Sequence, residues 1–341
     1  MASPLTIRSI RARPLALPLR KQVETASGTL TTAPLVLVDV RTEEDITGCA
    51  YASIYSPLAL EPLARLIENL AELLASTSAE PAAAESVLER HFKLLGLQGL
   101  TGIAIATVDM ALWDAQAKAA GLPLARLLGG EVRPIPAYAS LGKMTARAAA
   151  ADAAEALALG FTAFKVKVGR SDLAADLETI RAVREAIGPD TELMVDYNQA
   201  LPVEEAIHRG RQLDAEGLAW IEEPTRADDW WGVTDMEKSI AARASQHVMF
   251  DAMKIGGVSG WLRAARLARA SALPVSTHVF PEFSAHLLAA TPTAHRLEYV
   301  DKVGPILTNP VEVVAGQVSL SDRPGAGIEW DERAIRQAAG S

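Results

Sequence analysis

The stretch FTAFKVKVGRSDLAADLETIRAVREAIGPDTELMVDYN, residues 161–198, decides the fold. Its two ends are short apolar runs typical of strands. They enclose a longer segment with apolar residues at three- and four-residue spacing, which is typical of a helix. The apolar runs are nearly continuous, as in strands that are covered on both faces. A strand, a helix and a second buried strand predict a parallel sheet covered by helices.

The same unit repeats along the middle of the chain. Strands are expected in IPAYAS, AFKVKVG, ELMVDYN, LAWIEE, QHVMFDA, LPVSTHV and HRLEYV, with helical stretches between them. These strands could close into a barrel or lie open as a doubly wound sheet. No G-x-G-x-x-G motif follows the first strand, which disfavours a dinucleotide-binding sheet.

The segments on either side have a different pattern. Residues 5–52 favour strands and residues 57–128 favour helices, so residues 1–130 are expected to form an α+β domain. The repeated unit occupies residues 131–302. Residues 303–341 return to strand and turn patterns and are expected to rejoin the first domain.

Composition restricts the kind of partner. The 341 residues are 49% apolar and carry a net charge of −9, which argues against a nucleic-acid or membrane-surface partner. No stretch approaches the roughly 18 apolar residues that a membrane helix needs. The N-terminus lacks the apolar core of a signal peptide. Cys49 is the one cysteine, which fits a reducing compartment. We therefore expect a soluble, cytoplasmic protein that acts on a small molecule.

Two lysines mark the end of one expected strand. Lys165 and Lys167 are two residues apart, so both side chains point to the same face. In a parallel barrel the reactive groups lie at the carboxyl ends of the strands. Two adjacent ammonium groups repel each other, which is expected to lower the pKa of at least one of them toward that of a useful base. The alternative is a solvent-facing edge strand with ordinary lysines.

Carboxylates end the next two strands. Asp196 and Asn198 lie on one face of their strand, and Glu222 and Glu223 follow the strand after it. A single carboxylate in such a place is often only a turn or capping residue. Oxygen ligands from two adjacent strands suit Mg²⁺, which keeps some of its waters and also takes substrate oxygens.

The last strands carry a possible acid–base pair. Asp251 ends one strand and His278 ends the next, so the carboxylate could fix the tautomer of the imidazole ring. Glu298 then ends the last strand. An isolated strand-end histidine is more often a packed residue, and structural roles are expected for the remaining histidines His91, His208, His247, His286 and His295.

Taken together, these strand ends resemble the mandelate racemase group of the enolase superfamily. The matching features are Lys165-x-Lys167, Asp196-x-Asn198, Glu222-Glu223-Pro224, Asp251 with AMKIGG, His278 and Glu298. The similarity extends from the N-terminal strands to GIEW. It implies a modified TIM-type (β/α)7β barrel with an α+β capping domain, and we also expect a homo-oligomer.

The resemblance implies a reaction that begins by removing the α-proton of a 2-hydroxy carboxylate such as mandelate. Lys167 and His278 would be bases on opposite faces of the α-carbon, with His278 oriented by Asp251. Asp196 and Glu222 would hold Mg²⁺, which stabilises the enediolate in this superfamily. Lys165 would neutralise the substrate carboxylate, and a protonated Glu298 would donate a hydrogen bond to it, assisted by Ser140. Asn198 would also bind the substrate.

Substrate choice is expected to lie in the N-terminal domain. The resemblance places Val23, Leu30 and Tyr55 in an apolar pocket that could accept a phenyl group. Val23 and Leu30 belong to the stretch KQVETASGTLTT, residues 21–32, which is expected to be a mobile loop. An ordinary flexible connector is the alternative interpretation of that stretch.

One feature departs from the family. Only one helix separates the Glu222 strand from the Asp251 strand, so a strand, a helix and a third metal carboxylate seem absent at Asp229–Trp230. If residues are missing there, the Cα separation should exceed the usual value of about 3.8 Å. If the chain is continuous, Asp228 or Asp229 could replace the lost ligand. Three interpretations therefore stay open: a racemase, a sugar-acid dehydratase, and a deletion variant with an impaired metal site.

Overall fold

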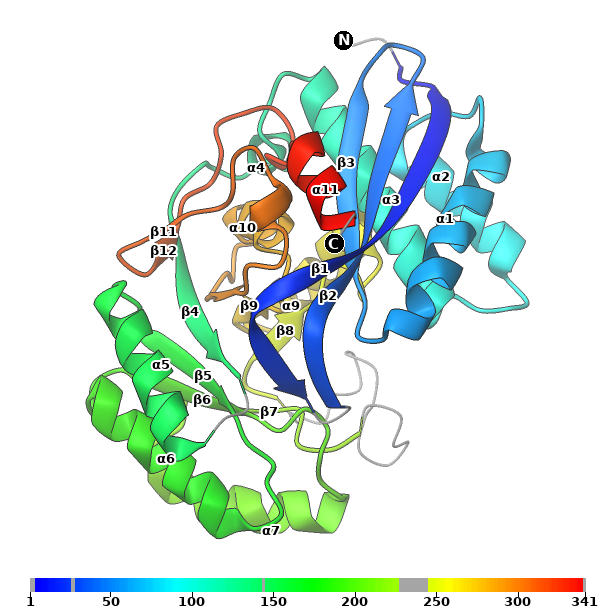
Figure 1. Ribbon diagram of the computed structural model, residues 1–341. Helices are drawn as coiled ribbons and strands as arrows, with labels where there is room; N and C mark the ends of the chain where they lie inside the picture. The colour runs from blue at the N-terminus through cyan, green and yellow to red at the C-terminus, as the bar shows by residue number, and fades with distance from the viewer. Residues whose placement is uncertain (1–3, 26–27, 143–144, 227–244, 340–341) are drawn as a thin grey trace.

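The computed structural model describes residues 4–25, 28–142, 145–226 and 245–339 (Figure 1). Its N-terminal part is a three-stranded antiparallel sheet in the order β1-β2-β3, followed by helices that pack against it. These elements are β1 Ile7–Thr25, β2 Gly28–Thr42, β3 Thr47–Ser53, η1 Pro57–Ala59, α1 Leu60–Leu74, α2 Pro81–Phe92, α3 Leu100–Ala119 and α4 Leu124–Leu127. No helix in the described part of the chain has the length and apolar character to cross a bilayer.

Strand β2 explains why this part is not a free-standing sheet. Leu35, Val36, Leu37 and Val38 are all fully buried, although successive side chains of a strand point to opposite faces. Both faces of the strand are therefore covered. Helix α3 packs against β2 and β3, and the C-terminal helix α11, Glu332–Ala339, packs against β1.

The prediction of a loop at residues 21–32 is wrong, because most of this stretch is paired strand. Strands β1 and β2 continue through it as a hairpin, with Val23 opposite Leu30 and Thr25 opposite Gly28. Residues 26–27 lie outside the described part. The alternation of β-branched and polar residues on both arms favours extended pairing, and the prediction of a loop gave that pattern too little weight.

All seven strands predicted in the middle of the chain are present and parallel, and each overlaps its predicted stretch. They are β4 Ile135–Leu141, β5 Ala163–Lys167, β6 Glu192–Asp196, β7 Ile221–Glu222, β8 Val248–Phe250, β9 Val275–Thr277 and β10 Leu297–Tyr299. Helices α5 Ala146–Ala158, α6 Leu173–Ile187 and α7 Val203–Leu213 follow β4, β5 and β6, and η2 Asp214–Glu216 follows α7. Helices α9 Gly257–Ala270 and α10 Pro281–Ala289 follow β8 and β9.

These strands curve into an incomplete barrel. Strands β4, β5, β6 and β7 pair in sequence order, and β10 pairs with the other edge of β4. Strand β9 joins β10 through a hydrogen bond from the Thr277 N–H to the Arg296 carbonyl (3.1 Å), and β8 pairs with β9. The resulting order is β7-β6-β5-β4-β10-β9-β8, and in the described residues β7 and β8 do not pair.

A large cavity separates the two unpaired strands. It measures about 1010 Å³, and its walls include Trp220 and Glu222 on the β7 side and Val248 and Met249 on the β8 side. Within the described residues, no strand lies between β7 and β8, and a barrel that lacks a strand is expected to expose two edges and empty part of its core. The Asp229–Trp230 junction, together with Asp228, lies outside the described residues.

The C-terminal segment contacts both parts of the molecule. Strands β11 Val313–Val314 and β12 Gln317–Val318 extend the barrel sheet, because β12 pairs antiparallel with the start of β4. The segment preceding them contains η3 Gly304–Ile306. Beyond these strands the chain returns to the N-terminal sheet, where Trp330 donates a hydrogen bond to Asp39 at 2.8 Å. The tail thus contacts the first domain, as expected, and in addition extends the barrel sheet.

Candidate active site

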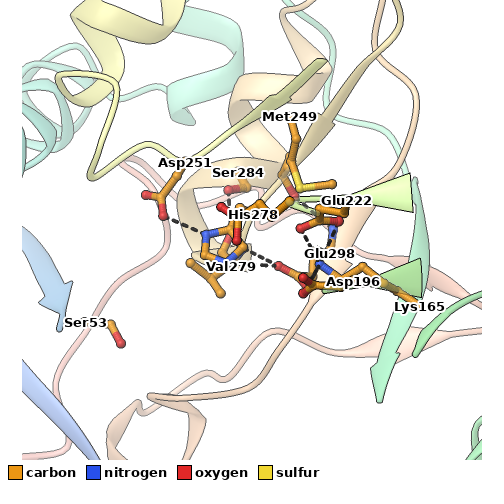
Figure 2. Close-up of polar contacts among 12 residues, drawn as sticks. Ser53, Lys165, Asp196, Glu222, Met249, Asp251, His278, Val279, Ser284 and Glu298 are labelled. Carbon is orange, nitrogen blue, oxygen red and sulfur yellow. Dashed lines mark hydrogen bonds and ion pairs between the residues drawn. The ribbon is translucent and has the colours of Figure 1, made fainter. Parts of the chain in front are cut away.

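Polar side chains meet at the carboxyl ends of six barrel strands, β5 to β10 (Figure 2). Lys165 on β5 lies at the centre and is almost fully buried. Its Nζ is 2.7 Å from Glu298 Oε1, 2.9 Å from Glu222 Oε1 and 3.6 Å from Asp196 Oδ2. The sequence predicted this gathering, since carboxyl ends of parallel strands share one edge.

The charges of this cluster differ from the sequence expectation. Burial works to lower the pKa of Lys165, but Glu222 and Glu298 outweigh it and hold the pKa well above its usual value. Repulsion between the two lysines therefore does not determine the pKa of Lys165. In this structure its positive charge is matched by protein carboxylates, and its expected role in neutralising a substrate carboxylate stays a prediction.

Glu298 also has a strongly shifted pKa. Burial works to raise its pKa, but Lys165 and His278 lower it far below the usual range. Glu298 accepts a hydrogen bond from the Val279 N–H at 3.0 Å. Its ammonium neighbour, which the sequence did not show, favours the carboxylate form, so a protonated Glu298 that donates to a substrate stays a prediction.

Lys167 occupies a more open position. Its Nζ donates to Asn198 Oδ1 at 2.6 Å and lies 3.2 Å from Asp196 Oδ2. The Asn198 amide in turn donates to both oxygens of Asp196, at 2.8 and 2.9 Å. Asn198 was predicted to bind substrate, whereas here it orients Asp196 and Lys167.

His278 and Asp251 form the expected pair. His278 Nδ1 lies 2.7 Å from Asp251 Oδ2, while the backbone N–H groups of Met253 and Lys254 donate to Asp251 Oδ1 at 2.8 and 3.2 Å. The carboxylate is thus fixed before it meets the ring. If Nδ1 carries the proton toward Asp251, Nε2 is left as the basic nitrogen, and it lies 3.9 Å from Glu298 Oε2.

Backbone strain collects at the same edge of the barrel. Asn198, Glu223 and Val279 lie just beyond the ends of β6, β7 and β9, and they have φ angles of 46°, 43° and 49°. Non-glycine residues rarely adopt this left-handed region, and strain of this kind clusters at functional sites.

A cavity of about 470 Å³ lies between this edge and the N-terminal domain. Lys167, His278, Glu298 and Ser140 line its barrel side. Its opposite wall is largely apolar and includes Leu17, Leu30 and Tyr55. Two predicted pocket residues, Leu30 and Tyr55, are therefore in place, while the side chain of Val23 lies outside the described atoms.

One charged residue of this cavity was not predicted from the sequence. Lys302, just beyond β10, lines it together with Ser53 at the end of β3. The sequence signal for Lys302 is its position: it lies four residues after Glu298, directly beyond a strand that ends at the predicted site.

The donor set for a metal is incomplete in the described residues. Asp196 and Glu222 lie opposite each other in the register of β6 and β7, and both offer carboxylate oxygens, the ligands that Mg²⁺ prefers. Around Lys165 and Lys167 there is one more carboxylate than ammonium, which favours an added cation. Within the described ranges, however, no group of three or more histidine, cysteine, aspartate or glutamate side chains could hold a metal ion.

Family models cover most of the chain. The model described as mandelate racemase / muconate lactonizing enzyme, N-terminal domain, matches residues 7–129. The model described as enolase C-terminal domain-like matches residues 148–233 and 229–334. This chain belongs to the enolase superfamily, in its mandelate racemase group.

Known members of the superfamily agree with this assignment. A crystal structure of an enolase from Bradyrhizobium complexed with magnesium and mandelic acid is 40% identical, covers 99% of both chains and has a TM-score of 0.93. The L-talarate/galactarate dehydratase of Salmonella typhimurium is 33% identical over 71% of this chain and 67% of its own length. The 3,6-anhydro-alpha-L-galactonate cycloisomerase of Streptomyces coelicolor is 31% identical over 98% of this chain and 100% of its own.

The comparisons also bear on the missing barrel unit. The C-terminal family model matches in two segments that meet at residues 229–233, where the sequence placed the gap. The match to the Streptomyces cycloisomerase extends over 367 residues, 26 more than the 341 of this chain. Superfamily relatives therefore contain residues for which this chain has no counterpart.

Proposed function

We propose that this protein removes the α-proton of a 2-hydroxy carboxylate and returns it to the opposite face, as a racemase of mandelate-like acids. The observation that carries the proposal is that Lys167 and His278 line the same cavity from β5 and β9. Strands β4 and β10 lie between these two strands in the barrel order, so the bases reach the cavity from separated directions.

The chain's own residues account for the proton transfers. His278 Nε2 takes the proton from one face, and the electron pair of the broken C–H bond passes into the carboxylate as an enediolate. Lys167, as an ammonium, returns a proton to the other face. Asp251 keeps His278 in the tautomer that can act as a base. Asp196 and Glu222 would hold Mg²⁺, which when bound supplies the positive charge that an enediolate needs.

The shape of the cavity supports an apolar substrate body. Leu17, Leu30 and Tyr55 form the wall that faces the reacting groups, and about 470 Å³ is a normal size for a small-molecule site. The related Bradyrhizobium enolase was crystallised with mandelic acid and magnesium. A phenyl group on the α-carbon would be buried against this wall.

Dehydration is the second candidate, supported by similarity to a talarate/galactarate dehydratase. In that reaction one residue removes the α-proton and His278 protonates the departing β-hydroxyl, which leaves as water. The product is a 2-keto acid, whereas a racemase returns a 2-hydroxy acid. The third possibility, a protein with an impaired metal site, predicts little of either product.

Proton exchange distinguishes these functions. With Mg²⁺ in D₂O, a single enantiomer of mandelate should lose its α-proton NMR signal and become racemic. Dialysis against a chelator should abolish exchange and Mg²⁺ should restore it, because a proton next to a carboxylate is too weakly acidic without nearby positive charge. Full exchange after metal removal would contradict the metal-dependent mechanism, and a 2-keto product from sugar acids would identify a dehydratase.

A further inference from the structure

Lys302 places an ammonium group in the wall of the substrate cavity. Its Nζ donates a hydrogen bond to Ser53 Oγ at 3.0 Å and lies 5.5 Å from the centre of the Tyr55 ring. Within the described residues it forms no ion pair, unlike Lys165 and Lys167 in the same region.

Its setting makes this charge costly without an anion. Lys302 is half-buried, and burial lowers its pKa to about 8, with Lys167 and Lys254 acting in the same direction against Asp251 and Glu298. The side chain therefore stays largely protonated at neutral pH. A partly buried cation is normally paired or coordinates another group, and because no described residue forms an ion pair with Lys302, an anion in the cavity would supply that partner.

The contacts of Lys302 show which part of a substrate it meets. Ser53 ends β3, and Tyr55 follows two residues later, so both belong to the N-terminal wall. The groups that act on the α-carbon, Lys167 and His278, come from the barrel wall. In Figure 2, Ser53 lies apart from the barrel cluster, beside the N-terminal strands. Lys302 thus reaches the cavity beside Ser53 and Tyr55 of the N-terminal wall.

We propose that Lys302 is a specificity-determining residue that binds a second anionic group of the substrate. The substrate class is then a 2-hydroxy acid with an apolar body and a distal carboxylate. This inference rests on the proposed function for the reacting end of the molecule. The apolar wall still takes the body of the substrate, while Lys302 and Ser53 hold its far end.

The test compares α-proton exchange of mandelate with that of its 3- and 4-carboxylated derivatives, in the Mg²⁺-loaded protein. The wild type should prefer one carboxylated acid in kcat/KM. Lys302→Met should remove roughly 10- to 100-fold of that preference, the effect of one charge-assisted hydrogen bond, and leave mandelate little changed. Lys254→Met is the matched control, because Lys254 also lies over the Tyr55 ring, at 5.1 Å, but does not line this cavity.

Calorimetric binding of the same acids separates the two proposals. If no acid exchanges but the carboxylated one binds more tightly than mandelate in a manner that requires Lys302, the inference stands and the proposed function fails. If Lys302→Met weakens mandelate and its derivatives equally, or changes only the thermal stability, Lys302 is a contact between domains and the inference is overturned. A wild type that shows no preference among these acids, in exchange or in binding, would overturn it as well.

Discussion

Lys165 and Lys167 are two residues apart on the same face of β5, yet their surroundings give them different roles. Lys165 is enclosed by Glu222, Glu298 and Asp196, and its raised pKa makes it a permanent positive charge. Lys167 reaches the cavity and contacts Asp196 and Asn198. Of the two, only Lys167 can meet a substrate proton directly.

The opposed bases give a stereochemical prediction. His278→Asn should stop racemisation but still allow exchange of the α-proton of one enantiomer in D₂O, because Lys167 still serves one face. Lys167→Ala should retain exchange of the other enantiomer only. NMR of each enantiomer with each variant measures this directly. If both folded variants lose exchange with both enantiomers, the assignment of two separate bases is wrong.

For single residues, the sequence predicted where the side chains lie better than it predicted whether they are ionised. Strand periodicity and parallel topology brought Lys167, Asp196 and His278 to one edge, as the spacing indicated. The charge neighbour of Glu298 could not be predicted, because Lys165 at 2.7 Å is 133 positions away in the chain. Lys302 was missed because it lies beyond a strand, where periodicity gives no direction to a side chain.

Among the elements, β7 and β8 differ from the other barrel strands. Strands β5 and β6 pair on both sides, whereas in the described residues β7 pairs only with β6 and β8 only with β9. Strand β7 is the shortest of the seven barrel strands in the described part of the chain, at two residues, while β8 has three residues, as do β9 and β10. The sequence anticipated this gap from the spacing of Glu222 and Asp251, since a single helix cannot supply a missing strand between them.

Hydrogen exchange should report the unpaired edges. Amides of Ile221–Glu222 and Val248–Phe250 should exchange faster than those of Ala163–Lys167 and Glu192–Asp196, because edge strands open locally at lower free energy. Mass spectrometry of labelled peptides would measure the difference in the native protein. Equal protection of all four strands would show that β7 and β8 are covered in solution.

Over the whole molecule, helix α10 joins the barrel to the N-terminal domain through two buried titratable groups. Glu282 accepts a hydrogen bond from the Tyr51 hydroxyl of β3 at 2.7 Å. One turn later, His286 Nδ1 accepts from the Ala125 N–H of α4 at 3.1 Å. Both groups lie between the two domains, so their ionisation is linked to how the domains associate.

These two groups change stability with pH in opposite directions. Burial raises the pKa of Glu282 from 4.5 to about 7, so its contribution is present at low pH and is lost as pH rises through this range. Burial lowers the pKa of His286 from 6.5 to about 4, so its contribution is lost as pH falls. The wild-type curve alone therefore mixes the two effects, and variants are needed to separate them.

Glu282→Gln isolates the carboxyl group, because glutamine keeps an oxygen for Tyr51 but cannot ionise. Relative to this variant, the wild type should lose on the order of 3 kcal/mol of unfolding free energy between about pH 4.5 and pH 7. Urea denaturation at a series of pH values measures it. Tyr51→Phe is the control, since it removes the hydrogen bond but keeps the carboxyl group. Because that hydrogen bond lowers the pKa of Glu282, the loss of stability with rising pH in this variant should be at least as large as in the wild type. If Glu282→Gln and the wild type change in parallel across this range, then Glu282 ionises as readily in the folded protein as in the unfolded chain, and the junction between the domains is open to water.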